Sequence, residues 1–501
     1  MTCTNQVGTQ NNKKEKDVKK SIAKNYIYNL IYQMLTILLP FITTPYLSRV
    51  LGAENIGIYG YTTSIVTYFI LFGTLGVAMY GQREIAYQQQ DKKGISKTFL
   101  EIVGIRMVSL AISILVFYLL FGRTGDYAIY YQILIIQLVA NIFDISWLFQ
   151  GIEEFDKTVV RNLIVKILSL LLIFFLVKTP EDLWKYFAIY VGAELIGNIS
   201  LWLYVPKYIE KVSWKQLEFK KHLKPTLALF IPQIAIQIYT VLDKTMIGVI
   251  TKDMIEVGYY EQAQKVVKAT LVVITALQTV MNSRIANAYA IDDKKEIKQC
   301  LEKSFHFVWV LVIPMIFGLI AIIPNFVPWY YGDGFEGVTP ILIATTPILI
   351  PIGLNGITGI QYLVQIGKQK IFTISVTIGA IVNIIFNLVL IYFWGGVGAA
   401  IASIIAETTI LGIQLKYFKE QFTLREILKL SIKCLLSGVI MFIILEILVH
   451  FMAVSIGNTI IQIIIGGMVY IMMLLLLKYQ FLKDVWIQVT TGLKRKIQKE
   501  G

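Results

Sequence analysis

Long apolar segments with helical rather than alternating periodicity run through almost the whole chain. Most are about 20 residues long, the length that an α-helix needs to cross a bilayer, and only helices and closed barrels can span lipid. The pattern predicts about fourteen transmembrane helices, near residues 25–48, 55–79, 98–121, 127–149, 160–177, 184–206, 225–250, 257–283, 301–325, 338–363, 371–393, 398–417, 431–452 and 458–478.

The predicted fold is therefore an all-α polytopic membrane protein. Two six-helix bundles related by an internal repeat are followed by two C-terminal helices. The parts are a basic tail (1–24), an N-terminal bundle (25–206), a second bundle (225–417), helices 13 and 14 (431–478) and an amphipathic tail (479–501). The last of these keeps apolar residues on one side and lysines on the other, as a helix lying on the membrane surface does.

Composition and charge agree with this interpretation. The 501 residues are 56% hydrophobic and 16% charged, which leaves a soluble protein nowhere to bury its apolar surface. Most of the 46 Lys and Arg residues fall in the tails and in the loops on the same side. Under the positive-inside rule both termini are predicted to be cytoplasmic. The net charge of +14 needs no nucleic acid to explain it, since this bias and anionic lipid account for it.

Residues with the chemistry of an active site are scarce. The three cysteines have no metal-ligand spacing. The histidines, His222, His306 and His450, lie in separate segments and are expected to be packing or interfacial residues. No loop is long enough to form an external catalytic domain. The chain is predicted not to be an enzyme and to hold no metal or cofactor.

Charged residues interrupt the predicted helices 225–250 and 257–283. A charge within a spanning helix costs about 2.5–3.5 kcal/mol on insertion scales, so it normally faces protein or water and marks a pathway. Two stripes at helical spacing result, one of Gln233, Gln237, Thr240 and Lys244 and one of Glu261, Lys265 and Lys268. The two faces are polar and net cationic, which indicates a site for an anionic ligand. Alternatively the charges pair with one another, as Glu261 and Lys265 can at i, i+4.

A weak internal repeat links the two halves. At an offset of 201, Gly57, Tyr59 and Arg83 match Gly258, Tyr260 and Arg284, and Ala193-Glu194 resembles Ala406-Glu407. Parallel repeats of this kind place a substrate path between halves. The first predicted span also has a polar stripe, which includes Asn29 and Tyr32.

Five acids at predicted membrane depth are candidates for binding H⁺ or Na⁺. They are Asp144, Glu194, Asp243, Glu261 and Glu407. The alternative is that they pair with Arg106 or Lys166. The sequence does not decide between an ion gradient, membrane potential and downhill transport.

Several segments together resemble the Wzx-like polysaccharide flippases of the multidrug/oligosaccharidyl-lipid/polysaccharide exporter superfamily. They are PYLSRVLGAENIGIYGY (45–61), GQREIA (81–86), WLFQGIEEF (147–155), LDKTMIG…VGYYEQAQKV (242–266) and GVGAAIASIIAE (396–407). The resemblance implies a V-shaped pair of bundles around a central cavity that opens alternately to each face. It also implies a bacterial cell membrane as the location and an undecaprenyl-pyrophosphate-linked oligosaccharide as cargo, with a groove for the lipid tail at helices 13 and 14. The charge of Glu446, in helix 13, does not suit such a groove.

Lys and Arg suit a diphosphate headgroup, Arg as a bidentate fork and Lys as a point charge. The expected headgroup contacts are Lys244, Lys265 and Lys268, with Arg49, Arg83 and Arg284 near the cavity mouths. Asn29, Tyr32, Gln233 and Gln237 are expected to bind sugar. Two alternatives stay open: an ion-coupled drug or metabolite exporter of the same superfamily, and a membrane glycosyltransferase or repeat-unit polymerase.

Overall fold

The computed structural model describes the backbone of residues 4–482. Side chains are described from residue 39 to 482, except at 155, 228–229, 231–233, 235–236, 238–240 and 276–280. The chain divides into two compact units, unit 1 (Met1–Gln237) and unit 2 (Ile238–Gly501). The division lies inside one helix, within the predicted second bundle (225–417).

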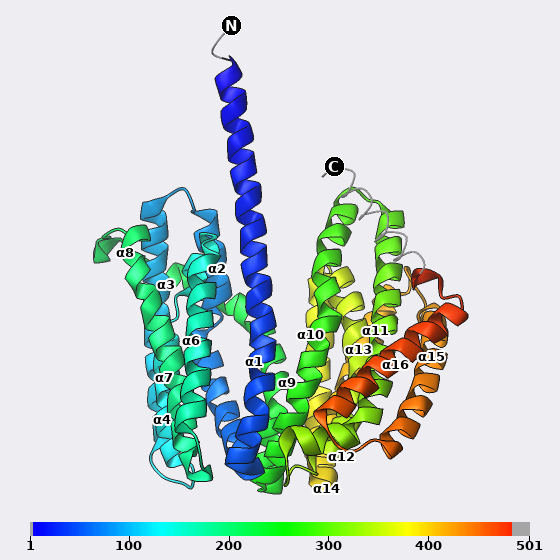
Figure 1. The fold of residues 1–501 in the computed structure, drawn as a ribbon. Helices are drawn as coiled ribbons and strands as arrows, with labels where there is room; N and C mark the ends of the chain where they lie inside the picture. The colour runs from blue at the N-terminus through cyan, green and yellow to red at the C-terminus, as the bar shows by residue number, and fades with distance from the viewer. Residues whose placement is uncertain (1–3, 483–501) are drawn as a thin grey trace. The chain divides into compact units, whose positions relative to one another are not determined.

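Unit 1 is built from upright helices that pack side by side (Figure 1). They are α1 (Thr4–Thr74), α2 (Val77–Tyr87), α3 (Lys92–Phe117), α4 (Ala128–Ile142), α5 (Ser146–Gly151), α6 (Phe155–Leu176), α7 (Leu183–Leu201), the short α8 (Val205–Tyr208) and the first part of α9 (Lys220–Thr251). A π-helical turn, Tyr118–Gly122, extends α3, and short 3-10 turns cover Pro180–Asp182, Trp202–Tyr204 and Trp214–Gln216.

The long α1 is two helices joined at a kink. Gly52 has φ 76°, a left-handed conformation in which a side chain would be strained. This break coincides with the predicted loop between the first two spans. Pro40 and Pro45 lie upstream within the same helix.

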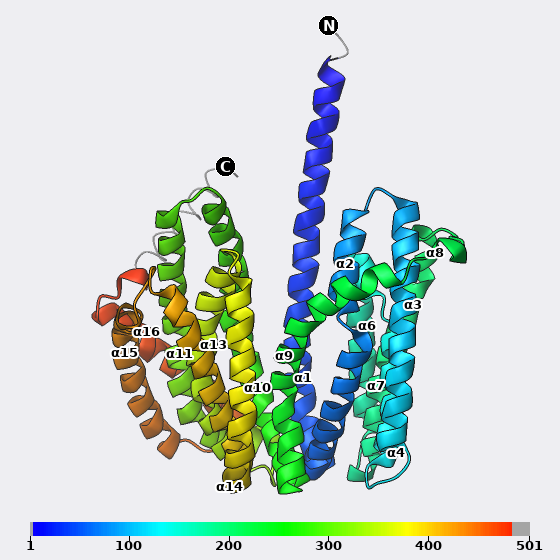
Figure 2. The ribbon, with the colours of Figure 1, turned by 180° about the vertical axis from the view of Figure 1, so that it is seen from behind.

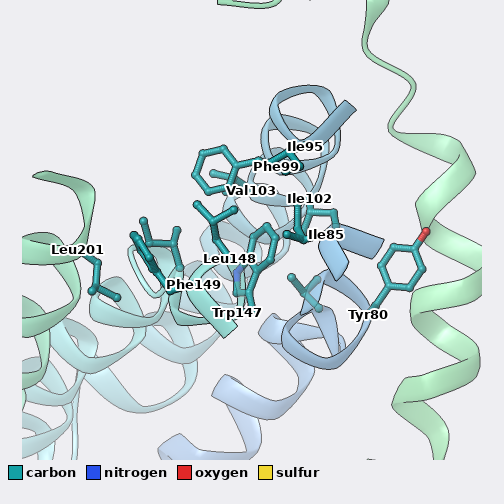
Figure 3. Close-up of a cluster of buried hydrophobic side chains, with 12 residues drawn as sticks. Tyr80, Ile85, Ile95, Phe99, Ile102, Val103, Trp147, Leu148, Phe149 and Leu201 are labelled. Carbon is teal, nitrogen blue, oxygen red and sulfur yellow. The ribbon is translucent and has the colours of Figure 1, made fainter. Parts of the chain in front are cut away.

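Aromatic and branched side chains, contributed mainly by α2, α3 and α5, form a buried cluster in unit 1 (Figure 3). Trp147 is fully buried and packs on Phe99, with ring centroids 5.7 Å apart. A Cβ at Gly81 would lie 2.5 Å from the Trp147 ring, so α2 and α5 meet closely only because this position has no side chain. Tyr80 lies at the edge of the cluster, with its hydroxyl pointing away from it (Figure 3).

Unit 2 contains the end of α9 and the remaining helices. They are α10 (Met254–Ala290), α11 (Lys294–Tyr331), α12 (Val338–Thr345), α13 (Leu349–Asn355), α14 (Gln369–Phe418), α15 (Leu424–Phe451) and α16 (Ile456–Leu476), with a 3-10 turn at Thr346–Ile348 and a π-helical segment at Gly356–Val364. The long α14 is again two helices, joined at Gly395 (φ 52°). α15 and α16 pack against each other and against α11 (Figures 1 and 2).

The fold class is confirmed. Ten helices in the described chain are long and apolar enough to cross a membrane. The fourteen predicted spans fall mainly on helical residues, two of them on α14 alone. α9 and α10 are not among these ten. Much of the apolar part of α9 lies outside the residues whose side chains the structure describes, and α10 carries Glu261, Lys265 and Lys268 on one face. The count of fourteen and the finer division into bundles stay predictions. The amphipathic tail lies largely outside the described residues, which end at 482.

Candidate functional site

The charged faces of α9 and α10 come together in unit 2 because a short turn joins the two helices. α9 ends at Thr251 and α10 begins at Met254. Asp253 caps α10, its side chain accepting a hydrogen bond from the Ile255 N–H at 2.8 Å. Lys252, in the turn, has φ 56°. The reversal sets the second turn of α10 opposite the last turns of α9.

We call Lys244, Glu261, Lys265 and Lys268 the lysine cluster. Lys244 Nζ lies 2.8 Å from Glu261 Oε2, and the two side chains are 17% and 15% exposed. Lys265 is half-buried and Lys268 is exposed, one and two turns further along the same face of α10. The cluster therefore holds three ammonium groups and one carboxylate, which gives this face of the helix pair a net positive charge.

The alternative that the charged residues of α9 and α10 pair with one another is true of only two of those that the structure describes. Glu261 bonds across the helix pair to Lys244 rather than to Lys265 at i+4, so this ion pair does join two helices. Lys265 and Lys268 form no ion pair with any side chain that the structure describes. Mutual neutralisation accounts for Lys244 and leaves these two lysines to be explained.

Asp243, next to Lys244, belongs to a second and neutral network. Its Oδ2 accepts hydrogen bonds from the Tyr260 hydroxyl (2.5 Å) and the Ser403 hydroxyl (2.8 Å), and its Oδ1 accepts one from Asn387 Nδ2 (2.7 Å). Asn383 completes the network by bonding to Asn387 and Ser403.

The members of this Asp243 network are all buried, and Asp243 itself is 7% exposed. Buried charges are normally paired with an opposite charge or bound to a cation. Here every described donor to Asp243 is a neutral hydroxyl or amide. Such a carboxylate can hold a proton or a small cation without breaking an ion pair.

The three remaining candidate acids lie in both units, and one of them, Asp144, is in an ion pair. Arg106 donates through Nε to the Asn141 carbonyl (2.8 Å) and through Nη2 to Asp144 Oδ2 (3.3 Å), as the pairing alternative for Asp144 requires. Glu194 accepts hydrogen bonds from Gln137 (3.1 Å) and Asn141 (3.2 Å). In unit 2, Glu407 accepts a hydrogen bond from Asn355, at 2.5 Å.

The predicted arginines are spread over both units. Arg49 is exposed and donates to the Pro45 carbonyl at 3.0 Å. Arg83 pairs with Glu84 at 3.2 Å and lies over the Tyr80 ring. Arg284 is exposed near the end of α10. Gln237 is exposed, whereas the side chains of Asn29, Tyr32 and Gln233 lie outside the described residues.

Sequence reasoning missed a buried network at the start of α9. His222, expected to be a packing or interfacial residue, is 2% exposed and lies 2.7 Å from Glu101 Oε2 through Nε2. Its Nδ1 lies 2.8 Å from the Tyr80 hydroxyl. Lys221 also contacts Glu101, at 3.1 Å. The network fixes the first turn of α9 to α2 and α3. Glu101 and His222 are separated by 121 positions in the chain, which explains why no spacing pattern revealed their contact.

Comparison with known proteins points in one direction. The profile of a family described as polysaccharide biosynthesis protein matches residues 22–282. A protein of Escherichia coli (strain K12) named "Putative O-antigen transporter" is 24% identical over 408 residues, which cover 80% of this chain and 97% of that protein.

Among solved structures, the lipid II flippase MurJ in an inward closed conformation superposes with a TM-score of 0.72 at 18% identity, over 89% of this chain and 98% of that one. An inward-facing multidrug resistance MATE family transporter of the MOP superfamily gives a TM-score of 0.61 at 14% identity, over 81% and 98%. At these identities the two structures establish the fold alone.

Proposed function

Because the chain belongs to the polysaccharide biosynthesis protein family, we propose that it is a flippase that carries a lipid-linked oligosaccharide across a membrane. The relative named as an O-antigen transporter supports this proposal. The similar proteins are transporters and flippases by name, which agrees with the expectation that the chain is not an enzyme.

We propose further that the cargo is an undecaprenyl-pyrophosphate-linked oligosaccharide. The observation that carries this step is the lysine cluster, three ammonium groups on two membrane helices that share one carboxylate. Hydrocarbon excludes a diphosphate, so a carrier must supply a polar and cationic path while the prenyl chain stays in lipid. Charge-assisted hydrogen bonds from lysine to phosphate oxygens are about twice as strong as neutral ones.

Lys265 and Lys268 are the proposed primary contacts of the headgroup, since neither is engaged in an ion pair in the described structure. Lys244 joins them once its bond to Glu261 is exchanged. Arg49, Arg83 and Arg284 are exposed and accessible to a ligand, and they remain proposed secondary contacts. Both termini are proposed to be cytoplasmic, in a bacterial inner membrane, with the two six-helix bundles alternating access to a path between them.

Asp243 is the proposed coupling residue among the five acids. Asp144 is engaged with Arg106 and Glu261 with Lys244. Asp243, Glu194 and Glu407 each accept hydrogen bonds from neutral donors, and Asp243 is the one of the three that is adjacent in the chain to Lys244 of the lysine cluster. Its network and the lysine cluster share neighbouring residues on α9, so protonation of Asp243 or cation binding there would alter the local field at Lys244. We propose H⁺ or Na⁺ as the coupling ion.

Reconstitution in liposomes tests the proposed function. The purified protein is incorporated with a fluorescent diphosphate-linked oligosaccharide lipid, and a membrane-impermeant quencher reports the amount of cargo in each leaflet. The flippase predicts exchange of the cargo between leaflets, with its mass unchanged. Formation of new glycosidic bonds would instead identify a glycosyltransferase, and exchange of a cationic drug but not of this lipid would identify a drug exporter.

A further inference from the structure

Glu261 is the unexpected member of the lysine cluster. A site that only had to attract an anion would gain from three ammonium groups without a carboxylate among them. Yet Glu261 lies on the same face of α10 as Lys265 and Lys268, and its Oε2 is 2.8 Å from Lys244 Nζ. The Glu261 side chain is 15% exposed, so the pair is partly accessible.

A carboxylate oxygen and a phosphate oxygen seek the same partner. Both accept charge-assisted hydrogen bonds from an ammonium group at similar distances. A phosphate that approaches Lys244 must therefore displace Glu261 or bind beside a like charge. Either event reduces affinity, and like charges a few ångströms apart in partly buried surroundings weaken binding by at least about tenfold.

The ion pair between Glu261 and Lys244 is useful to the carrier when no cargo is bound. A carrier binds and releases the same molecule, so its affinity must be high enough for loading and low enough for release. Without cargo, three ammonium groups would be left uncompensated at membrane depth, a state that membrane helices avoid. Glu261 provides a partner for Lys244 whenever the headgroup is gone.

We propose that Glu261 is an internal counter-ion that competes with the cargo's phosphate for Lys244 and so promotes release and return of the empty carrier. The inference rests on the proposed function and adds a role for an acid in the headgroup site. It assigns Glu261 to specificity and turnover rather than to coupling.

The test compares wild type with Glu261→Gln, which removes the charge and keeps the shape. Glu302→Gln is the matched control, because Glu302 is exposed near the start of α11 and lies outside the cluster. The probe is a synthetic short-chain prenyl diphosphate that carries one N-acetylhexosamine. Its affinity is measured by calorimetry in detergent, and flipping of its fluorescent analogue is measured in liposomes.

Glu261→Gln should bind the probe at least about tenfold more tightly and flip it more slowly, while Glu302→Gln matches wild type in both assays. In a Lys244→Gln background the gain from Glu261→Gln should shrink, because the competition acts through Lys244. Glu261→Asp keeps the charge and should bind and flip the probe as wild type does. Folding of each variant is judged by its elution from a sizing column, and Glu261→Asp is the variant that tests the proposal if Glu261→Gln folds poorly.

Equal or weaker binding by Glu261→Gln, with wild type binding and flipping the probe, overturns the role of Glu261 and leaves the proposed function standing. If Glu261→Gln does not fold, loss of affinity in Glu261→Asp to the level of Lys244→Gln overturns it as well. Wild type that neither binds nor flips the probe refutes the proposed function itself, and the inference with it.

Discussion

Replacing Asp243 by Asn and by Ala should separate the structural role of this residue from its proposed coupling role. Asp243 accepts hydrogen bonds from Tyr260, Ser403 and Asn387, all buried. Ala leaves these three donors without their acceptor. An unsatisfied buried donor costs about 1 kcal/mol at the lower end of the range. We take this lower value because hydrogen bonds between membrane helices are weak on average. The three donors together therefore lower the free energy of unfolding by about 3 kcal/mol.

Asp243→Asn should cost far less. The new amide keeps one oxygen for Tyr260 and Ser403, and its NH₂ faces Asn387, whose Oδ1 accepts no hydrogen bond from the described residues. If the Asn387 amide rotates, its Oδ1 accepts a hydrogen bond from the NH₂ of the introduced amide, and its Nδ2 loses the bond to Asn383. About one hydrogen bond is then lost in total, roughly 1 kcal/mol of stability. Thermal unfolding in detergent, followed by tryptophan fluorescence, should therefore rank wild type above Asp243→Asn and both well above Asp243→Ala.

Transport provides the second measurement. Asp243→Asn can neither release a proton nor offer a carboxylate to a cation, so flipping should lose its dependence on a proton or sodium gradient while the protein remains folded. A gradient dependence equal to that of wild type would refute coupling at Asp243. Unfolding of Asp243→Asn as severe as that of Asp243→Ala would refute the analysis of its hydrogen bonds.

Three further predictions concern other sites. Arg106→Ala should lower stability by about 1–3 kcal/mol because it removes the buried guanidinium that bonds to the Asn141 carbonyl and to the partly buried Asp144 carboxylate, and a melting curve checks this; a shift close to zero would mean that the pair is solvated. Gly81→Ala should cost about 1–3 kcal/mol, since its Cβ would meet the Trp147 ring at 2.5 Å, whereas unchanged melting would show that α2 moves freely against α5. Lys244→Arg should retain more flipping than Lys244→Glu at matched protein levels, and equal activity of the two would argue that Lys244 never meets phosphate.

The sequence could predict what depends on neighbours along one helix. Helix positions followed from hydropathy, and the shared face of Glu261, Lys265 and Lys268 followed from the 3.6-residue repeat. The proximity of Lys244 to this face was accessible too, because a short turn joins α9 to α10. The kink at Gly52 fell where the loop between two spans was expected.

Contacts between helices that are far apart in the chain could not be predicted from the sequence. Asn387 and Ser403 lie 144 and 160 residues from Asp243, so no periodicity connects them to it. His222 was underestimated for the same reason, since its partners Glu101 and Tyr80 come from helices far earlier in the chain. Polar residues inside apolar helices reveal that a partner exists, but only packing between helices decides which one.

The positive charge of the lysine cluster is the central claim, and neutralising it tests that claim most directly. A variant with Lys244, Lys265 and Lys268 all replaced by Gln is reconstituted beside wild type, and flipping of a fluorescent diphosphate-linked oligosaccharide lipid is measured at equal protein content. We predict that the variant elutes as a folded protein and flips the lipid at the rate of protein-free liposomes. Flipping at the wild-type rate would contradict the account, because the headgroup would then cross without these charges.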